Sequence, residues 1–192
     1  MSNHLSQNNL DQLYKKELKN IGKTGIEEIK KSQQLKGQLS RNKSIFLCHS
    51  HLDRTIVDKM VMLFNKIDID LYVDWMDLNM PQLTDRNTAR IIKDKIDKSH
   101  KFVFLATYNA LRSKWCNWEL GIAYSSKGEN DFAILPIESR SGKWKGNEYL
   151  QLYPEMKIDG LEDVQSLKAE DIMISFYDDR TVNFIDWLLI TK

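Results

Sequence analysis

The chain has 192 residues, of which 42% are hydrophobic and 29% are charged, so it can bury one good core with some residues left over. Lysine and arginine number 28 and aspartate and glutamate 27, which leaves a formal net charge of +1. This balance predicts neither nucleic acid nor an anionic membrane as a partner, because both attract proteins through concentrated positive charge.

The cysteines and the first residues indicate where the protein works. Cys48 and Cys116 lie far apart and form no CxxC pair, which favours a reduced, intracellular protein over a disulfide scaffold. The first twenty residues contain no apolar stretch typical of a signal peptide, and no segment approaches about 18 consecutive apolar residues. We therefore expect a cytoplasmic protein with no membrane partner.

Residues 1–42 differ in composition from the rest and predict an N-terminal helical extension. They are rich in Lys, Gln, Asn and Glu, and their apolar residues recur at helical spacing, first from Leu10 to Ile21 and then from Ile26 to Leu35. The GKTG stretch at 22–25 lacks the earlier glycine and the preceding buried strand of a phosphate-binding loop. We interpret it as a turn between two helices.

From residue 43 onward, short apolar runs alternate with amphipathic ones. The apolar runs predict strands at 44–50, 70–75, 100–107 and 131–139. The amphipathic segments predict helices at 54–68, 86–99 and 114–126, and a closing helix at 180–190. This alternation is typical of βαβ units, so residues 43–192 are expected to form one domain with a parallel sheet covered by helices on both faces.

In such a sheet, ligands bind beyond the carboxyl ends of the strands. The segments that follow the predicted strands are HSHLD (49–53), DWMDLNMPQLTD (74–85), TYNALRSKW (107–115) and ESRSGKW (138–144). A phosphate-receiving receiver domain shares this architecture. It would need adjacent acids after the first strand and an aspartate ending the third, where this chain has CHSH and LATYNA. The receiver chemistry is therefore excluded while the fold prediction stands.

Glu119 occupies an unexpected position in the predicted helix at 114–126. At about 100° per residue, it falls on the same arc as Trp115, Trp118 and Ile122, which is the apolar face. The helix dipole favours an acid within the first turn of a helix. If Ser113 is the N-cap, Glu119 lies beyond that turn, so the dipole does not explain its position. Two interpretations remain open: a functional carboxylate, or a structural acid paired with a lysine or arginine.

The other candidate residues carry weaker signals. His49 and His51 lack a third nearby ligand at recognisable spacing, so we expect no metal. Ser50 is surrounded by no nucleophile elbow, and Asp53 is expected to cap the helix that begins near residue 54. Trp75 ends the second strand and is followed by a loop segment that contains Asp77 and Asn79, so we expect it to line the opening above the sheet.

These residues together resemble the TIR domain family, in particular the bacterial TIR signalling enzymes of Thoeris antiphage defence. The resemblance runs from about residue 43 to the C-terminus and rests on IFLCHSHLD, LYVDW and KFVFLATYNALRSKWCNWELGIA. The last segment is the most specific, with a serine, a tryptophan and a glutamate four residues after the tryptophan. The chain departs from the family in the loop after the second strand, where the usual Arg-Asp-x-x-Pro-Gly is absent. The resemblance implies a flavodoxin-like doubly wound parallel sheet of about five strands.

Many TIR domains cleave NAD⁺ at the nicotinamide glycosidic bond, and Glu119 matches the catalytic glutamate of that activity. Nicotinamide in NAD⁺ is already a cationic leaving group, so one carboxylate suffices where ordinary glycosidases use two. Trp115 would stack on nicotinamide or adenine. The remaining residues expected to contact the substrate are Ser50, Asp53 and Trp75 around the opening, with Asp77 and Arg86 in the loop.

The resemblance also implies what the enzyme produces and with what it interacts. NAD⁺ would be a substrate and no cofactor is expected. The product would be ADP-ribose, a cyclic ADP-ribose isomer or a conjugate, sensed by a separate effector protein, and TIR domains commonly self-associate. Two alternatives remain open: a non-catalytic TIR interaction module, and a nucleoside deoxyribosyltransferase that uses its glutamate as a covalent nucleophile.

Overall fold

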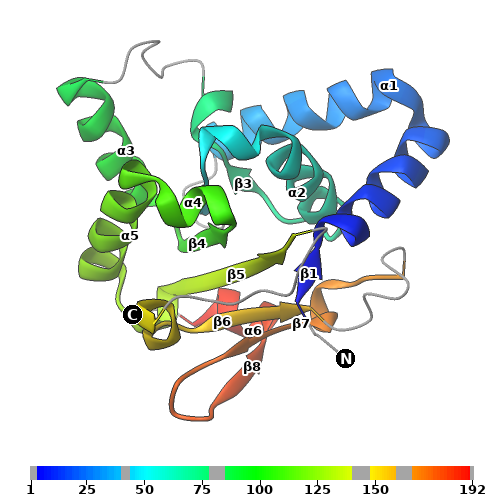
Figure 1. Ribbon diagram of the computed structural model, residues 1–192. Coiled ribbons are helices and arrows are strands. Elements are labelled where there is room, and N and C mark those ends of the chain that lie inside the picture. Colours follow the sequence, from blue (N-terminus) through cyan, green and yellow to red (C-terminus); the bar gives the residue numbers. More distant parts are fainter. Residues whose placement is uncertain (1–3, 40–43, 78–84, 140–147, 159–165, 191–192) are drawn as a thin grey trace.

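A central sheet organises the molecule. The computed structural model describes residues 4–39, 44–77, 85–139, 148–158 and 166–190. The strands pair in the order β3-β2-β4-β5-β6-β7-β8. Figure 1 labels all of these strands except β2. Their bounds are β2 Ile45–Cys48, β3 Leu71–Tyr72, β4 Lys101–Ala106, β5 Phe132–Glu138, β6 Glu155–Ile158, β7 Ile172–Ser175 and β8 Thr181–Asn183.

The predicted parallel sheet is confirmed, and it continues into an antiparallel edge. The pairs β2–β3, β2–β4, β4–β5 and β5–β6 are parallel, which gives the five expected strands. The pairs β6–β7 and β7–β8 are antiparallel and were not expected. The first part of the predicted closing helix is therefore strand β8. The helix itself, α6 Phe184–Leu189, begins only after Asn183, whose side chain accepts a hydrogen bond from the Asp186 N–H.

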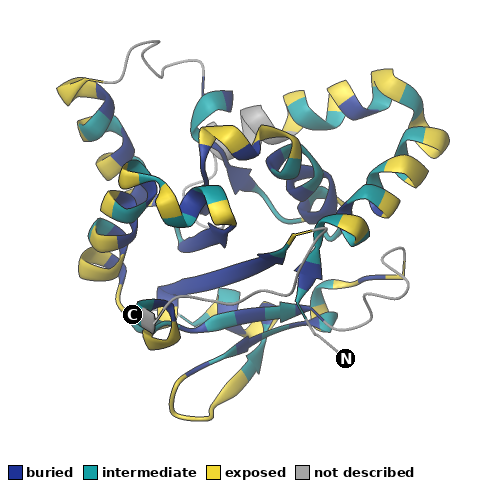
Figure 2. Ribbon diagram, in the orientation of Figure 1, coloured by how far each residue is buried: buried dark blue, intermediate teal, exposed yellow. Residues whose placement is uncertain are grey.

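Helices cover both faces of the sheet, so the central strands are buried on both sides (Figure 2). On one face, α1 Gln7–Leu39, α2 Arg54–Lys66 and α6 contribute to a core that includes Val103 and Leu105 of β4. On the other face, α3 Arg86–Lys98, α4 Tyr108–Arg112 and α5 Lys114–Lys127 pack against Phe102 and Phe104. Within the described residues, no helix combines the length and the apolar character needed to cross a bilayer.

The N-terminal segment is helical, as predicted, and it packs against the rest of the chain. Its strand β1 Leu5–Ser6 pairs with Ile137 and Glu138 at the end of β5. Gly22 interrupts α1 with a φ of 68°, a left-handed value that glycine adopts at little cost, so two helical stretches meet where the turn was expected. Leu10 and Leu13 are buried in the core beside α2.

Candidate active site

The helix that carries Glu119 begins where the sequence predicts. The Ser113 hydroxyl accepts a hydrogen bond from the Cys116 N–H at 3.2 Å, which makes Ser113 the N-cap of α5. Glu119 lies beyond the first turn of α5, and its relative exposure is only 3%. The predicted burial of this carboxyl group on the sheet-facing side of the helix is therefore observed.

Glu119 is surrounded by sulfur, an indole and a second acid. Burial is the main cause that raises the pKa of Glu119 well above its ordinary value, and the negative charge of Asp74 raises it further. Hydrogen bonds from the Cys48 thiol and the Trp115 side chain lower the pKa and offset part of this effect. Within the described residues, no lysine or arginine forms an ion pair with Glu119.

The two cysteines meet at the start of α5. The Cys48 thiol, at the end of β2, lies 3.8 Å from the Cys116 carbonyl oxygen. Both cysteines are free and buried. Burial is the largest cause that raises the pKa of the Cys48 thiol, and its neighbours Cys116 and Glu119 raise it as well. Cys48 therefore faces Glu119 as a neutral thiol that can donate a hydrogen bond to the carboxylate.

Trp115 and Trp118 form an aromatic pair beside the carboxyl group. Their ring centroids lie 4.8 Å apart with an interplanar angle of 34°. Trp115 is half-buried, whereas Trp118 is 37% exposed. One side of the Trp115 ring is thus occupied by Trp118, while its indole interacts with Glu119. The predicted position of Trp115 near the carboxyl group is observed.

A histidine and an aspartate link the ends of β2 and β3 close to Glu119. His49 Nδ1 lies 2.9 Å from the Leu47 carbonyl oxygen, and its Nε2 lies 3.4 Å from Asp74 Oδ1. Asp74 Oδ1 also accepts a hydrogen bond from the Trp75 N–H at 2.7 Å. The sequence placed both residues at strand ends but did not single out Asp74. Its position directly after a buried strand was the signal that could have identified it.

Trp75 lies next to Asp74, but its ring serves another contact. The guanidinium of Arg54 stacks over the indole, with Cζ 4.4 Å from the ring centroid. The rest of the ring packs against the core beside α2. Trp75 Nε1 is buried and has no hydrogen-bond partner among the described residues.

Asp53 and Ser50 are buried in the turn after β2. Asp53 occupies the N-cap position of α2, but its side chain makes no capping hydrogen bond, so the prediction that it caps this helix is wrong. Its carboxylate instead accepts hydrogen bonds from the Thr107 hydroxyl and, at 2.6 Å, from the Asn109 amide. These donors, from the end of β4 and from α4, bind the carboxylate in place of the backbone N–H groups at the start of α2. Ser50 accepts from the Leu52 N–H at 3.3 Å.

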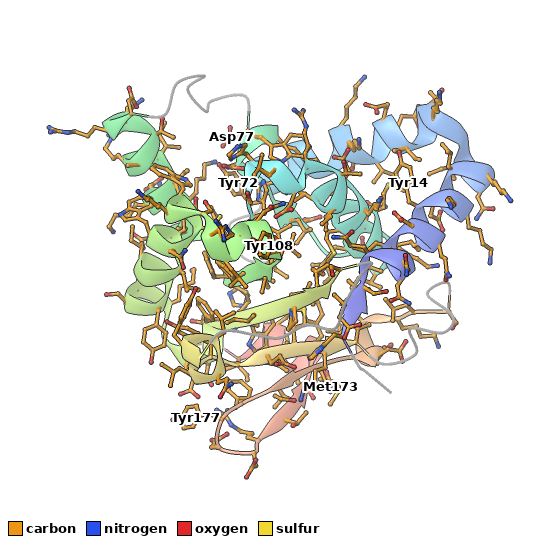
Figure 3. The ribbon with its side chains drawn as sticks, viewed as in Figure 1. Tyr14, Tyr72, Asp77, Tyr108, Met173 and Tyr177 are labelled. Atoms are coloured by element: carbon orange, nitrogen blue, oxygen red, sulfur yellow. The ribbon has the colours of Figure 1, made fainter. Side chains whose placement is uncertain are left out.

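Asp77 lies close to this site, whereas Arg86 does not join it. Asp77 Oδ2 accepts a hydrogen bond from the Tyr72 hydroxyl at 2.9 Å and lies 3.0 Å from Lys95 Nζ. Figure 3 labels Tyr72, the last residue of β3, next to Asp77. Arg86 is exposed in the first turn of α3 and has no contact with the residues above within the described part of the chain. The segments 78–84 and 140–147, which include much of two predicted openings, lie outside the described residues.

The acids of this site can recognise positive charge. Glu119, Asp74, Asp77 and Asp53 are four acids gathered beyond the carboxyl ends of β2, β3 and β4. In the ranges that the structure describes, no three His, Cys, Asp or Glu side chains are grouped so that they could hold a metal. The residues present can hold a cation through a buried carboxylate, and an aromatic ring lies beside it.

Comparison with known proteins gives consistent matches. A family model described as TIR domain matches residues 45–167. The chain is 29% identical over 124 residues to a putative cyclic ADP-D-ribose synthase, TIR2, of Cytobacillus dafuensis, covering 62% of this chain and 32% of that protein. It is 29% identical over 149 residues to a probable 3' cyclic ADP-D-ribose synthase, ThsB', of Bacillus cereus, covering 75% of this chain and 74% of that protein.

A further match is shorter. A segment of 56 residues is 43% identical to mouse Toll-like receptor 2 and covers 26% of this chain and 7% of the receptor. The chain thus spans about a third of the length of the Cytobacillus relative and about three quarters of the Bacillus relative.

Proposed function

Because the chain belongs to the TIR domain family, we propose that it is an NAD⁺-cleaving enzyme that releases nicotinamide and converts the remaining ADP-ribose into a signal. Two relatives named as cyclic ADP-D-ribose synthases support activity of this kind. The observation that carries the proposal is the carboxyl group of Glu119, buried among Cys48, Trp115 and Asp74 beyond the carboxyl ends of the strands.

The burial of Glu119 suits the reaction that we propose. The C1'–N1 bond breaks, its electron pair leaves with nicotinamide, and positive charge develops on the ribose. A carboxylate held in a poorly solvated place stabilises this cation more strongly than an exposed one. Since the free site raises the pKa of Glu119, we expect the cationic substrate to lower it on binding and so to favour the carboxylate form.

The other predicted residues receive roles that fit their contacts. Trp115 would stack on a flat ring through the side that Trp118 leaves open. Ser50 and Asp53 would shape the opening from the turn after β2, and Trp75 would border it through the Arg54 stack. We keep Asp77 and Arg86 as loop contacts, although Arg86 has no partner in the described site that holds it there.

The finer parts of the proposal concern the product and its setting. The product would be a cyclic ADP-ribose isomer or a conjugate, made in the bacterial cytoplasm as part of antiphage defence of the Thoeris type. A separate effector protein would sense it, and TIR–TIR contacts would assemble the enzyme. The names of the two bacterial relatives support a cyclic product.

The test is NAD⁺ consumption, with nicotinamide and its companion product resolved by chromatography and mass spectrometry. We expect the wild-type protein to release nicotinamide at high protein concentration or in phage-challenged cells, and Glu119→Ala to release none. The mass of the companion product would identify the signal. If both proteins leave NAD⁺ intact under challenge, the interaction-module alternative replaces this proposal. A trapped covalent ribosyl-enzyme would instead favour the transferase.

A further inference from the structure

We propose that Asp74 is a second carboxylate of the substrate site and binds the positively charged nicotinamide ring of NAD⁺ through its Oδ2 atom, while His49 and the Trp75 N–H hold Oδ1. This inference rests on the proposed function. It assigns to Asp74 the recognition of the leaving group and leaves stabilisation of the ribose cation to Glu119.

The first argument is the way in which Asp74 is held. Oδ1 accepts a hydrogen bond from the Trp75 N–H at 2.7 Å and lies 3.4 Å from His49 Nε2. Oδ2 makes no hydrogen bond to any residue that the structure describes. One oxygen is therefore fixed by the protein, and the other remains available to a ligand.

The second argument is the contact between His49 and Asp74. His49 Nδ1 lies 2.9 Å from the Leu47 carbonyl oxygen, and its Nε2 lies 3.4 Å from Asp74 Oδ1. The imidazole therefore sits between the backbone of β2 and Oδ1, so Oδ1 is the oxygen that faces the protein. The His49 side chain is 3% exposed, which keeps this partner fixed.

The third argument is the difference in accessibility between the two acids. The side chain of Asp74 is 29% exposed, whereas Glu119 is 3% exposed. A cation that approaches the site therefore meets Asp74 before it meets Glu119. The negative charge of Asp74 acts to raise the pKa values of Glu119, Cys116 and Tyr72, so Asp74 lies near all three side chains.

The chemistry of the substrate explains why two acids would be useful. Positive charge resides on the nicotinamide ring before cleavage and moves to the ribose as the C1'–N1 bond breaks. A carboxylate beside the ring thus stabilises the bound substrate, and one beside the ribose stabilises the transition state. Removal of Asp74 is expected to act mainly on KM and on the distinction between NAD⁺ and NADH, whose nicotinamide ring is uncharged.

The experiment compares binding and turnover. In a Glu119→Gln background, which slows the reaction enough for binding to be measured, calorimetry measures the affinities for NAD⁺ and NADH with and without Asp74→Asn. We expect Asp74→Asn to weaken NAD⁺ binding about tenfold and to leave NADH binding nearly unchanged. In the otherwise wild-type protein, the same substitution is expected to raise KM with a smaller change in kcat.

Two further variants control for charge and folding. Asp94→Asn removes an exposed acid on α3 that pairs with Lys98, and it should leave the NAD⁺ to NADH ratio unchanged. Asp74→Glu keeps the charge and should restore most of the discrimination, even if thermal unfolding shows that Asp74→Asn is less stable. An unchanged NAD⁺ to NADH ratio in Asp74→Asn, with active wild-type enzyme, overturns this inference alone. Absence of both NAD⁺ cleavage and NAD⁺ binding in the parent proteins overturns the proposed function as well.

Discussion

Replacing Glu119 by glutamine should change stability and activity in opposite directions. Glutamine has nearly the same shape but carries no charge that burial would penalise. A buried polar group that lacks full compensation costs about 1–3 kcal/mol. At ~2–4 °C per kcal/mol for a chain of this length, Glu119→Gln should raise the melting temperature by several degrees at neutral or alkaline pH. Nicotinamide release should fall on the order of a hundredfold or more.

The pH dependence of this stabilisation has a definite sign. The pKa of Glu119 is raised in the folded protein, mainly by burial and then by the charge of Asp74, against an unfolded value of about 4.3. The folded protein therefore holds its proton more tightly than the unfolded chain does. This contribution to stability is fully present below the unfolded pKa and is lost as the pH rises through the folded pKa. The glutamine variant does not lose this stability as the pH rises, because glutamine does not titrate.

The assay is thermal unfolding of both proteins between pH 4 and pH 8, followed by circular dichroism. The difference in melting temperature should be small at the acid end and largest at the alkaline end. Glu28→Gln, on the exposed face of α1, controls for the loss of one glutamate. A glutamine variant that melts below the wild type at pH 8, or by the same margin at every pH, would refute the argument that burial of Glu119 is costly.

Three other predictions follow from particular contacts. Leu13→Ala should cost about 2–5 kcal/mol in urea unfolding, because Leu13 belongs to the main core; an unchanged transition would mean that residues 1–42 fold separately. Asp53→Ala should cost about 1–3 kcal/mol, because Thr107 and Asn109 lose their acceptor; equal stability would show that water replaces it. Trp115→Ala should weaken NAD⁺ binding by about 1–3 kcal/mol in titration calorimetry, with Trp115→Phe losing less; equal losses would argue against stacking.

The parts of the fold that the sequence predicts are those with a strong local signal. β4 is buried at every position because helices cover both faces of the sheet, and such a strand reads as a continuous apolar run. The capping serine before α5 likewise depends only on residues within one turn. Since the helical period then fixes the side of α5 on which each residue lies, the burial of Glu119 could be predicted as well.

Features that depend on distant residues could not be predicted. β1 has two residues, too few to show a period, and its partner lies at the end of β5. Asp53 has the right residue type for a helix cap, but the fold brings Thr107 and Asn109 to it. In each case a tertiary contact decides the local structure, and the neighbouring residues in the sequence do not indicate that contact.

The pairing of Leu5 with Ile137 has a consequence for the order in which the chain folds. β1 leaves the ribosome before its partner β5, which is synthesised only after β2, β3 and β4. The pairing of β1 with β5 closes a long loop, and contacts of such high sequence separation slow folding. We expect the two helical stretches of α1 to form early and the N-terminal strand to dock late. A nascent chain truncated before β5 should consequently leave its first residues accessible to protease.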